Sequence, residues 1–311
     1  MPSSYSKHDL YELCVQSPTH LVPLLRAIHG ADPRTLAEDF CGTAALSREW
    51  VKQIDGGRAI AVDADDDTIA VARASCPDAV QLIQGDVIDA TEPRDHAADI
   101  LFVGNFSIGY WHTRPDLIRY LKHVHARLAS SPAPGGGSVT ESSKVTEGVR
   151  ERAGDAPTPS NLRPYDATQI HRRNTPGLFL CDTYAGESAF LTGHVHRNHP
   201  AEGGRVIRYT WEQRDADQLT GMVTNAIHFR VSRGGVIEQE IHDAFVYHWR
   251  LWSVPELRDC LLEAGFASTE VYAKVADAVD DQGNIYIHPA DPADLDDSFI
   301  VLVAGRTRDL E

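Results

Sequence analysis

Between residues 35 and 129, short apolar segments alternate with helix-like segments, and this alternation constrains the fold more than any other feature of the chain. The apolar segments predict strands, and the segments that follow them predict helices of ordinary length. Strands that are apolar on both faces and alternate with such helices are typical of a parallel sheet covered on both sides. The sequence therefore predicts an α/β fold with a mostly parallel sheet. The expected strands are 35–40, 58–64, 80–86 and 98–105, and the expected helices are 44–54, 66–76 and 115–129.

Two other segments flank or interrupt this pattern. Residues 8–29 have the apolar spacing of a helix on both sides of Pro18, so residues 1–34 form a helical segment ahead of the main domain. Residues 131–176 are rich in Pro, Gly, Ser, Thr and charge, a composition too poor in aliphatic residues to offset the entropy of ordering. We expect a mobile insertion there, followed by a buried strand at 177–186.

A change of pattern after residue 189 predicts a second sheet. Long alternating segments separated by turns within 190–252 favour antiparallel hairpins. A helix with Ser253 as its N-cap and two final strands then complete the first domain. The main domain would comprise 35–189 and 253–311, with an antiparallel subdomain at 190–252.

The composition excludes several classes of partner. Lys and Arg number 29 against 45 Asp and Glu, a formal net charge of −16, which argues against nucleic acid and anionic membrane surfaces as partners. No apolar run approaches the roughly 20 residues needed to cross a bilayer, and the N-terminus lacks an apolar signal-peptide core. Five widely separated cysteines without a C-x-x-C pair indicate free thiols in a cytoplasmic protein.

The segment GHVHRNH at 193–199 is the strongest candidate for metal ligands. On a strand, His194 and His196 would share a face, but the segment contains no carboxylate partner. This favours a solvated or substrate-facing strand, and we expect no metal site.

Polar residues recur at the ends of the first four expected strands. Glu38, Asp63, Asp86 and Asn105 are separated by 25, 23 and 19 residues, once per strand-helix unit. The carboxyl ends of adjacent parallel strands form the ligand crevice of an open α/β sheet, so these side chains point to one pocket. A carboxylate after the second strand can accept hydrogen bonds from both hydroxyls of a ribose.

The turn after the first strand has small residues where a ligand would approach the backbone. It reads Glu38-Asp39-Phe40-Cys41-Gly42-Thr43-Ala44 and leads into a helix, whose first amide groups and dipole would face that ligand.

This series of motifs resembles that of the class I S-adenosylmethionine-dependent methyltransferases. The motif EDFCGTA at 38–44 resembles the corresponding turn of a bacterial subgroup of these enzymes. The resemblance covers 35–125, 177–186 and 253–306. It implies a Rossmann-like, seven-stranded, mostly parallel sheet with an inserted antiparallel lid, S-adenosylmethionine as cofactor, and methyl transfer to a nitrogen or oxygen of a small-molecule acceptor.

The resemblance also implies the cofactor-binding residues. The turn around Gly42 would approach the methionine part with Glu38 beneath it, and Asp63 would hold the ribose. Asp86 and Val87 would face the adenine, and 105–107 would border the sulfonium. The N-terminal helical segment would cover the cofactor. The full set is Tyr11, Glu38, Phe40, Cys41, Gly42, Thr43, Ala44, Asp63, Ala64, Gly85, Asp86, Val87, Asn105, Phe106 and Ser107.

This chain departs from the family pattern at two positions of the turn. Phe40 and Ala44 stand where the family has its first and third glycines. We expect a tighter turn, and this departure puts the cofactor's pose and affinity in question.

The acceptor side depends on fewer features. Tyr110 and Trp111 follow the fourth strand, Tyr184 and Glu187 follow the fifth together with Asp182, and Arg250 lies among aromatic residues. A buried cation needs an anionic partner, so we expect Arg250 to bind a substrate carboxylate. His112 and His228 are the candidate bases for an acceptor proton.

Other functions stay open at this point. The same fold and cofactor would serve an alkyl or aminopropyl transferase, and a SAM-binding protein without catalysis is a further alternative. A nicotinamide-dependent dehydrogenase is disfavoured because the turn lacks the closely spaced glycines that admit a pyrophosphate. The sequence leaves open whether the chain forms a homodimer.

Overall fold

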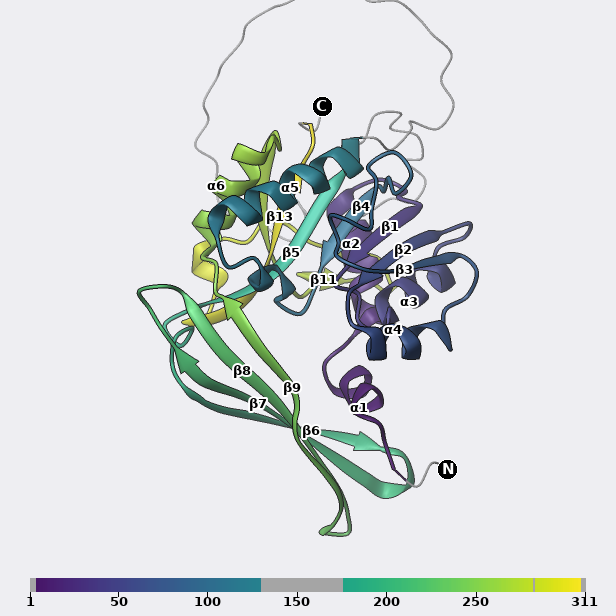
Figure 1. The fold of residues 1–311 in the computed structure, drawn as a ribbon, viewed down its shortest axis with the longest axis vertical. Coiled ribbons are helices and arrows are strands. Elements are labelled where there is room, and N and C mark those ends of the chain that lie inside the picture. The colour runs from purple at the N-terminus through teal and green to yellow at the C-terminus, as the bar shows by residue number, and fades with distance from the viewer. Residues whose placement is uncertain (1–3, 130–175, 282, 309–311) are drawn as a thin grey trace, which may run out of the picture.

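The central element of the fold is a seven-stranded sheet with the order β10-β13-β5-β4-β1-β2-β3 (Figure 1). Strands β1 to β5 pair in parallel, whereas β13 runs antiparallel to both of its neighbours, β5 and β10. This confirms the predicted Rossmann-like, mostly parallel sheet. The strands are β1 (Thr35–Asp39), β2 (Arg58–Asp63), β3 (Val80–Gln84), β4 (Ile100–Val103), β5 (Leu178–Gly186), β10 (Ser268–Ala273) and β13 (Ser298–Arg306).

The computed structural model describes residues 4–129, 176–281 and 283–308. Nearly all of the expected insertion at 131–176 therefore lies outside the described residues. Within the described part, no helix is both long and apolar enough to span a membrane.

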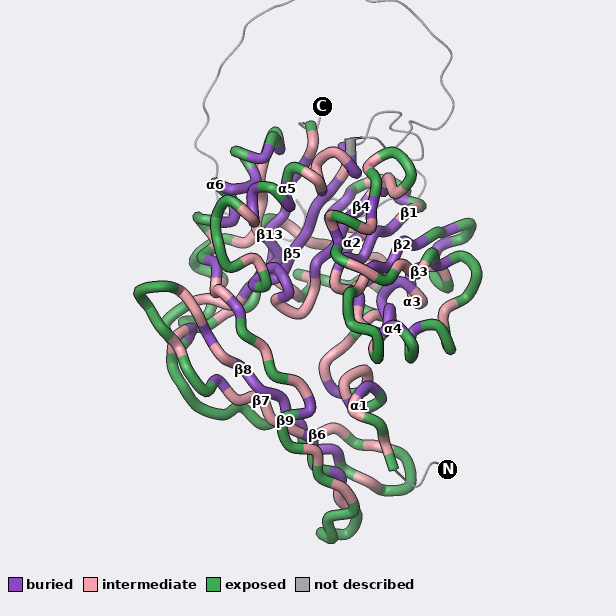
Figure 2. Tube along the Cα trace, viewed as in Figure 1, coloured by how far each residue is buried: buried purple, intermediate pink, exposed green. Residues whose placement is uncertain are grey.

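Helices cover both faces of the sheet because its central strands are apolar on both faces. Leu36 packs on the face that carries α2 (Pro18–His29) and α3 (Ala45–Gln53). Ala37 packs on the opposite face with α5 (Arg114–Ala129) and α6 (Val254–Ala264). Helix α4 (Asp66–Arg73) follows β2 and buries Ile69 and Ala72. Figure 2 shows the buried strands at the centre of this domain.

A buried ion pair ties α5 to the first strand. Arg127 Nη1 donates to both carboxylate oxygens of Asp39 at 2.8 and 2.9 Å, and the Tyr120 hydroxyl donates to Asp39 at 2.8 Å. Asp39 and Arg127 are fully buried, so each charge depends on the other for its stability.

The second sheet is antiparallel, with four strands in chain order: β6 (Gly193–Ala201), β7 (Arg205–Ala216), β8 (Met222–Arg233) and β9 (Val236–Arg250). It extends away from the main sheet, and its lower part is largely exposed (Figures 1 and 2). The alternating segments of 190–252 predicted such a sheet.

Helix α1 (Lys7–Cys14) packs on this second sheet, whereas α2 packs on the main one. Ser6 caps α1 with a capping box to Asp9. Leu10 and Cys14 are buried against Ile207, Tyr209 and other apolar residues of the antiparallel sheet. The N-terminal region is therefore divided between the two sheets.

Shorter elements complete the described chain. The acidic connection between the last two long strands contains a small hairpin of β11 (Ala278–Val279) and β12 (Ile285–Tyr286). The 3₁₀ helices are η1 (Ser107–Tyr110), η3 (Glu202–Gly204) and η4 (Pro292–Asp294).

Candidate active site

The turn after β1 has three residues in the left-handed region of backbone conformation. Phe40, Gly42 and Ala44 have φ angles of 59°, 57° and 57°. Only glycine adopts this region without steric cost, so Phe40 and Ala44 are strained. The Phe40 ring stacks on Tyr110 with a centroid separation of 5.6 Å, which helps to hold the turn in place.

Open space lies in front of this turn at Gly42. A Cβ atom built on Gly42 would meet only Thr68 Cγ2, at 4.0 Å. The backbone at this position can therefore be approached by a ligand.

Asp63, at the end of β2, is bound directly to the turn. Its Oδ2 accepts a hydrogen bond from the Gly42 amide at 2.8 Å, and its Oδ1 accepts one from the Asp65 amide at 3.0 Å. Burial raises the pKa of Asp63, and the backbone donors oppose that rise. The first two strand tips therefore meet, as the sequence predicted.

Glu38 is buried beneath the same turn. Its Oε2 accepts hydrogen bonds from the Ser47 amide at 2.9 Å and the Ser47 hydroxyl at 2.6 Å, which fixes the start of α3. Burial raises the pKa of Glu38 to about 7. This position supports the turn from below.

Thr43 and Cys41 face protein atoms. The Thr43 hydroxyl donates to Glu12 Oε1 at 2.5 Å, and Arg48 donates to the same oxygen at 2.6 Å, so α1 is fastened to the turn. Cys41 is buried.

Tyr11, on the same helix as Glu12, packs edge-on against Phe245 of β9 with a centroid distance of 5.0 Å. The sequence analysis did not identify Glu12.

The segment after β3 forms a short turn stabilised by Asp86. Its Oδ1 accepts hydrogen bonds from the amides of Ile88 at 2.8 Å and Asp89 at 3.3 Å. Gly85 leaves room for Ala90, whose Cβ would lie only 2.8 Å from a Cβ at position 85. Val87 is buried in the core of the main domain, and the Ala64 side chain is exposed.

The tip of β4 is held by a buried carboxylate. Asn105 and Phe106 have φ angles of 55° and 63°, and both amides donate to Asp182, at 3.1 and 2.7 Å. Lys274 Nζ binds the same carboxylate at 2.5 Å. Asp182, which we expected after the fifth strand, lies within β5 and is fully buried. Ser107 begins η1 and is buried.

Five aromatic residues between the β4 tip and the antiparallel sheet form what we call the aromatic cluster: Phe106, Tyr110, Tyr184, Trp211 and Trp249. The Phe106 ring meets Tyr184, Trp211 and Trp249 edge-on with centroid distances of 5.0, 5.8 and 6.1 Å. Tyr110 meets Trp249 at 6.0 Å. The cluster joins the two sheets.

Polar contacts position Tyr184, whereas two other expected acceptor residues lie outside the cluster. The Tyr184 hydroxyl donates to Gln213 Oε1 at 2.9 Å. Trp111 stacks on Tyr120 at 4.9 Å and packs against the main core. Glu187 is exposed, and its amide donates to the carbonyl oxygen of Asp297 at 2.7 Å.

The structure removes His228 from the crevice. Neighbouring residues of a strand point to opposite faces, so Glu212 lies on the face opposite to Trp211 and the aromatic cluster. His228 Nε2 contacts Glu212 Oε2 at 3.0 Å. Our assignment of His228 as a base is therefore corrected.

His112 also has a contact that limits a role as a base. Its Nε2 lies 2.8 Å from the carbonyl oxygen of His248, which can only accept, so this nitrogen carries the proton. The Nε2 atom is thus a donor in this arrangement.

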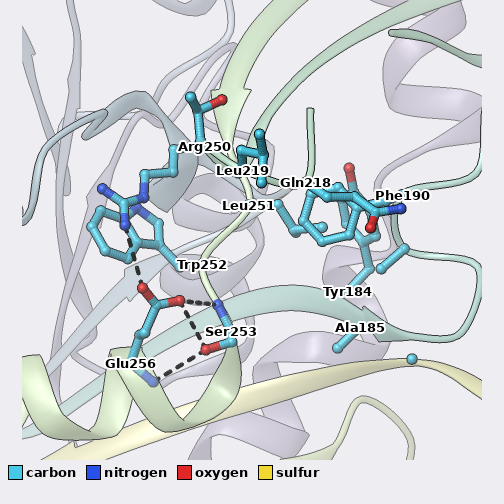
Figure 3. Close-up of a pocket in the computed structure, with 14 residues that line it drawn as sticks. Tyr184, Ala185, Phe190, Gln218, Leu219, Arg250, Leu251, Trp252, Ser253 and Glu256 are labelled. Carbon is cyan, nitrogen blue, oxygen red and sulfur yellow. Dashed lines mark hydrogen bonds and ion pairs between the residues drawn. The ribbon is translucent and has the colours of Figure 1, made fainter. Parts of the chain in front are cut away.

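A hollow of about 380 Å³ lies beside Tyr184, between the end of β5, the β7–β8 turn and the start of α6 (Figure 3). The Arg250 guanidinium stacks on the Trp252 ring at 3.8 Å and binds Glu256 Oε1 at 3.3 Å. Arg250 therefore already has an anionic partner within the protein. The residues that line this hollow include neither Gly42 nor Asp63.

Comparisons with solved structures identify the class of fold. No family model and no curated protein matches the chain. Among solved structures, the fold is shared with methyltransferases that use S-adenosylmethionine.

Three solved structures illustrate this similarity. The sugar N-methyltransferase KedS8 from Streptoalloteichus has a TM-score of 0.57 and 16% identity, covering 96% of this chain and 91% of its own. CalS10, an amino pentose methyltransferase from Micromonospora echinaspora solved with S-adenosylmethionine, has a TM-score of 0.56 and 13% identity, with coverages of 96% and 94%. An S-adenosylmethionine-dependent methyltransferase from Clostridium acetobutylicum has a TM-score of 0.54 and 12% identity, with 96% of both chains covered.

Proposed function

We propose that this protein transfers a methyl group from S-adenosylmethionine to a small-molecule acceptor. The observation that carries the proposal is the hydrogen bond from the Gly42 amide to Asp63, which joins a left-handed turn and a carboxylate at the tips of adjacent parallel strands. The similarity in fold to KedS8, CalS10 and the clostridial enzyme supports this function.

The residues around the turn fit such a cofactor. The open space at Gly42 would admit the methionine part close to the backbone. Each oxygen of Asp63 accepts one backbone hydrogen bond and keeps a lone pair for a ribose hydroxyl. Asp86 and Val87 would border the adenine, and the segment 105–107 would border the sulfonium.

The chain's contribution to the reaction would be alignment and exclusion of water. The cofactor supplies an electrophilic methyl group on a sulfonium, so a strong base is not required when the acceptor is a neutral amine. Asp182 fixes Asn105 and Phe106, and the aromatic cluster surrounds the Phe106 ring with apolar surface. These groups would hold the acceptor in line with the methyl group.

We infer that the acceptor atom is a nitrogen of a small polar molecule such as an amino sugar. The names of KedS8 and CalS10 as sugar N- and amino pentose methyltransferases support this choice. The hollow beside Tyr184 is the proposed entrance, and Arg250 would bind an acidic group of the acceptor there in exchange for Glu256. Tyr110, Trp111 and Glu187 would border the path.

The test of the cofactor is binding of S-adenosylhomocysteine. We expect it to raise the Tm of the wild-type protein, because a ligand that binds only the native state stabilises it. Asp63→Ala removes the carboxylate, and since one hydrogen bond to a charged group contributes about 1.5–3 kcal/mol, affinity measured by calorimetry should fall at least about tenfold.

Asp67→Ala serves as the control, because Asp67 is an exposed residue in the first turn of α4 and should bind as the wild type does. Circular dichroism checks that both variants are folded. If the wild-type protein does not bind S-adenosylhomocysteine, the proposed function is wrong.

The test of the acceptor uses isotopically labelled S-adenosylmethionine with amino sugars and the matching hydroxyl sugars. We expect label only in products of the amino sugars, and the product mass separates methyl from aminopropyl transfer. Label on the hydroxyl sugars would overturn the nitrogen assignment while preserving methyl transfer.

A further inference from the structure

Three polar side chains form a series of hydrogen bonds beside the aromatic cluster, and the last of them has an unused acceptor. The series runs from Gln213 of β7 through the Tyr184 hydroxyl to Asn225 of β8. Asn225 is fully buried, and its Oδ1 meets no hydrogen-bond donor among the residues that the structure describes. Buried polar groups are nearly always paired, so this exception calls for an explanation.

The direction of these hydrogen bonds follows from counting their protons. Gln213 Nε2 donates to the carbonyl oxygens of Ala189 and Leu191, both at 2.9 Å. Gln213 Oε1 is therefore the atom that faces Tyr184, whose hydroxyl donates its single proton to it at 2.9 Å. Burial raises the pKa of Tyr184 to about 12, which keeps that proton in place. The hydroxyl oxygen can then only accept, so Asn225 turns its Nδ2 toward it, at 3.4 Å, and the Asn225 carbonyl is fixed as the free acceptor.

Strand pairing places Asn225 on the face of the sheet that carries the aromatic cluster. Direct partners in an antiparallel sheet share a face, and Asn225 pairs with Gln213 on one side and Tyr247 on the other. Trp211 and Trp249 each lie two residues from one of these partners, so they share this face. Asn225 Oδ1 is therefore an acceptor without a donor on a face rich in aromatic rings.

Tyr184 connects this acceptor to the proposed path of the substrate. Its side chain lines the hollow beside β5 (Figure 3), and its ring meets the Phe106 ring edge-on at 5.0 Å. Phe106 belongs to the segment that we propose to border the sulfonium. The free carbonyl of Asn225 is thus one hydrogen bond away from a residue that borders both the hollow and the β4 tip.

On the basis of the proposed methyl transfer, we infer that Asn225 Oδ1 accepts a hydrogen bond from the amino group of the acceptor molecule. A neutral primary amine has two N–H groups and one lone pair, so donation of one N–H to Asn225 fixes the direction of the lone pair. As the nitrogen forms its new N–C bond, the S–C bond breaks, sulfur keeps the electron pair, and positive charge develops on the nitrogen, which afterwards loses a proton to solvent. A carbonyl oxygen and aromatic ring faces both stabilise that charge.

The chemistry of Asn225 Oδ1 also excludes one kind of group from this position. A carbonyl oxygen cannot donate a hydrogen bond, so it would repel a carboxylate or a phosphate. Arg250, which also lines the hollow, is the residue that we propose for an acidic group. Asn225 and Arg250 would therefore distinguish the amino end of an acceptor from its acidic end.

The test compares two sugars: D-glucosamine has an amino group at the carbon where 2-deoxy-D-glucose has only hydrogen. Calorimetric titrations of the full chain without cofactor measure the ratio of the two affinities, which should favour glucosamine in the wild type. Asn225→Ala should reduce this ratio about 10- to 100-fold, as expected for one hydrogen bond to a charged group. Asn225→Asp keeps the side-chain volume and an acceptor oxygen, so it should preserve or increase the ratio, whereas a merely structural role of Asn225 would not.

Thr224→Ala is the matched control, because Thr224 is the preceding residue of β8 and points to the opposite face, where its hydroxyl lies 3.2 Å from His248 Nδ1. It should keep the wild-type ratio, and circular dichroism checks that each variant is folded. The inference is wrong if the wild type does not prefer glucosamine, if Asn225→Ala keeps the wild-type ratio, or if Asn225→Asp loses it. S-adenosylhomocysteine affinity is measured separately and should be unchanged in every variant. Its absence in the wild type would reject the proposed function, whereas the sugar ratio, measured without cofactor, reports on Asn225 alone.

Discussion

Asp182 fixes the conformation of two consecutive strained residues. Its carboxylate accepts the amides of Asn105 and Phe106, which have positive φ angles, and it binds Lys274. A neutral amide at this position would lose the ion pair and retain at most part of the hydrogen bonding. Asp182 therefore links the geometry of the β4 tip to the far end of the chain.

We predict that Asp182→Asn lowers the free energy of unfolding by about 1–3 kcal/mol, because a buried charge-assisted network is broken. The amides of Asn105 and Phe106 should exchange with deuterium faster than in the wild type, measured by mass spectrometry of peptides that span 100–110. Lys274→Met combined with Asp182→Asn should cost less than the sum of the single changes. Unchanged exchange at residues 105 and 106 would show that Asp182 does not hold this tip.

The Glu38 carboxyl should give the stability of the protein a distinctive dependence on pH. Its native pKa is raised to about 7 from a reference of 4.5, because the group is buried. Between these two values the native state keeps the proton and the unfolded state does not, so the free energy of unfolding falls as the pH rises. The slope approaches about 1.4 kcal/mol per pH unit and disappears above pH 7.

We predict that Glu38→Gln lacks this slope, since an amide does not titrate. Urea unfolding of both proteins at pH 5, 6, 7 and 8 measures the difference in slope. Parallel curves for the two proteins would contradict the raised pKa.

At the residue scale, the sequence identified the strand tips but not the groups that support them. Gly42 and Asp63 were predictable because each follows a recognisable strand, and the carboxyl ends of parallel strands meet. The contact between Asp182 and Lys274 joins residues 92 positions apart, and that between Thr43 and Glu12 joins residues 31 apart. Such pairs depend on how elements pack, which periodicity does not report.

Helix α1 is held at both of its sides, and this makes it the element that connects the turn to the antiparallel sheet. Glu12 accepts hydrogen bonds from Thr43 and Arg48, while Leu10 is buried against the antiparallel sheet. Figure 1 shows α1 between the main domain and the strands β6 to β9. A change at Glu12 should therefore alter the turn at Gly42, where we propose that the cofactor binds, although Glu12 itself is bound to Thr43 and Arg48.

We predict that Glu12→Ala accelerates deuterium exchange across residues 5–14 and weakens S-adenosylhomocysteine binding up to about tenfold, equivalent to one lost charge-assisted contact. Glu263→Ala, which removes an exposed ion pair between Glu263 of α6 and Arg114 of α5, should change neither measurement. If the residues of α1 exchange deuterium in Glu12→Ala at the same rate as in the wild type, packing against the antiparallel sheet is sufficient to hold the helix.

At the element scale, the alternating patterns predicted the faces of β9 but not the place of His228. Residues at every second position of a strand share a face, so simple alternation puts Tyr247 and Trp249 together, and their rings stack on each other with a centroid distance of 4.3 Å. The face of β8 that carries His228 depends on its register with β7, and the β8–β9 pairing is irregular beside it. Register comes from the partner strand, so a single strand's pattern could not settle which face meets the crevice.

At the scale of the whole molecule, η1 of the main domain packs directly against β9 of the antiparallel sheet. Trp252 Nε1 donates to the Trp111 carbonyl at 2.9 Å, and a Cβ built on Gly109 would lie 2.7 Å from Trp249 Cβ and 3.1 Å from the Arg250 carbonyl oxygen. Neither neighbour is the end of a flexible side chain. The absence of a side chain at Gly109 therefore determines how near the antiparallel sheet lies to the β4 tip.

We predict that Gly109→Ala forces the antiparallel sheet outward and lowers the free energy of unfolding by about 1–3 kcal/mol, as overpacking does in a well-packed interior. The aromatic cluster would separate, so the fluorescence of Trp249 and Trp211 should shift toward that of solvated indole. Ser107→Ala, in the same 3₁₀ helix, removes an atom instead of adding one and should preserve the native spectrum. If Gly109→Ala retains both the wild-type stability and the wild-type emission, the two sheets have freedom to move apart, and the cluster does not fix the distance between the proposed cofactor and acceptor sites.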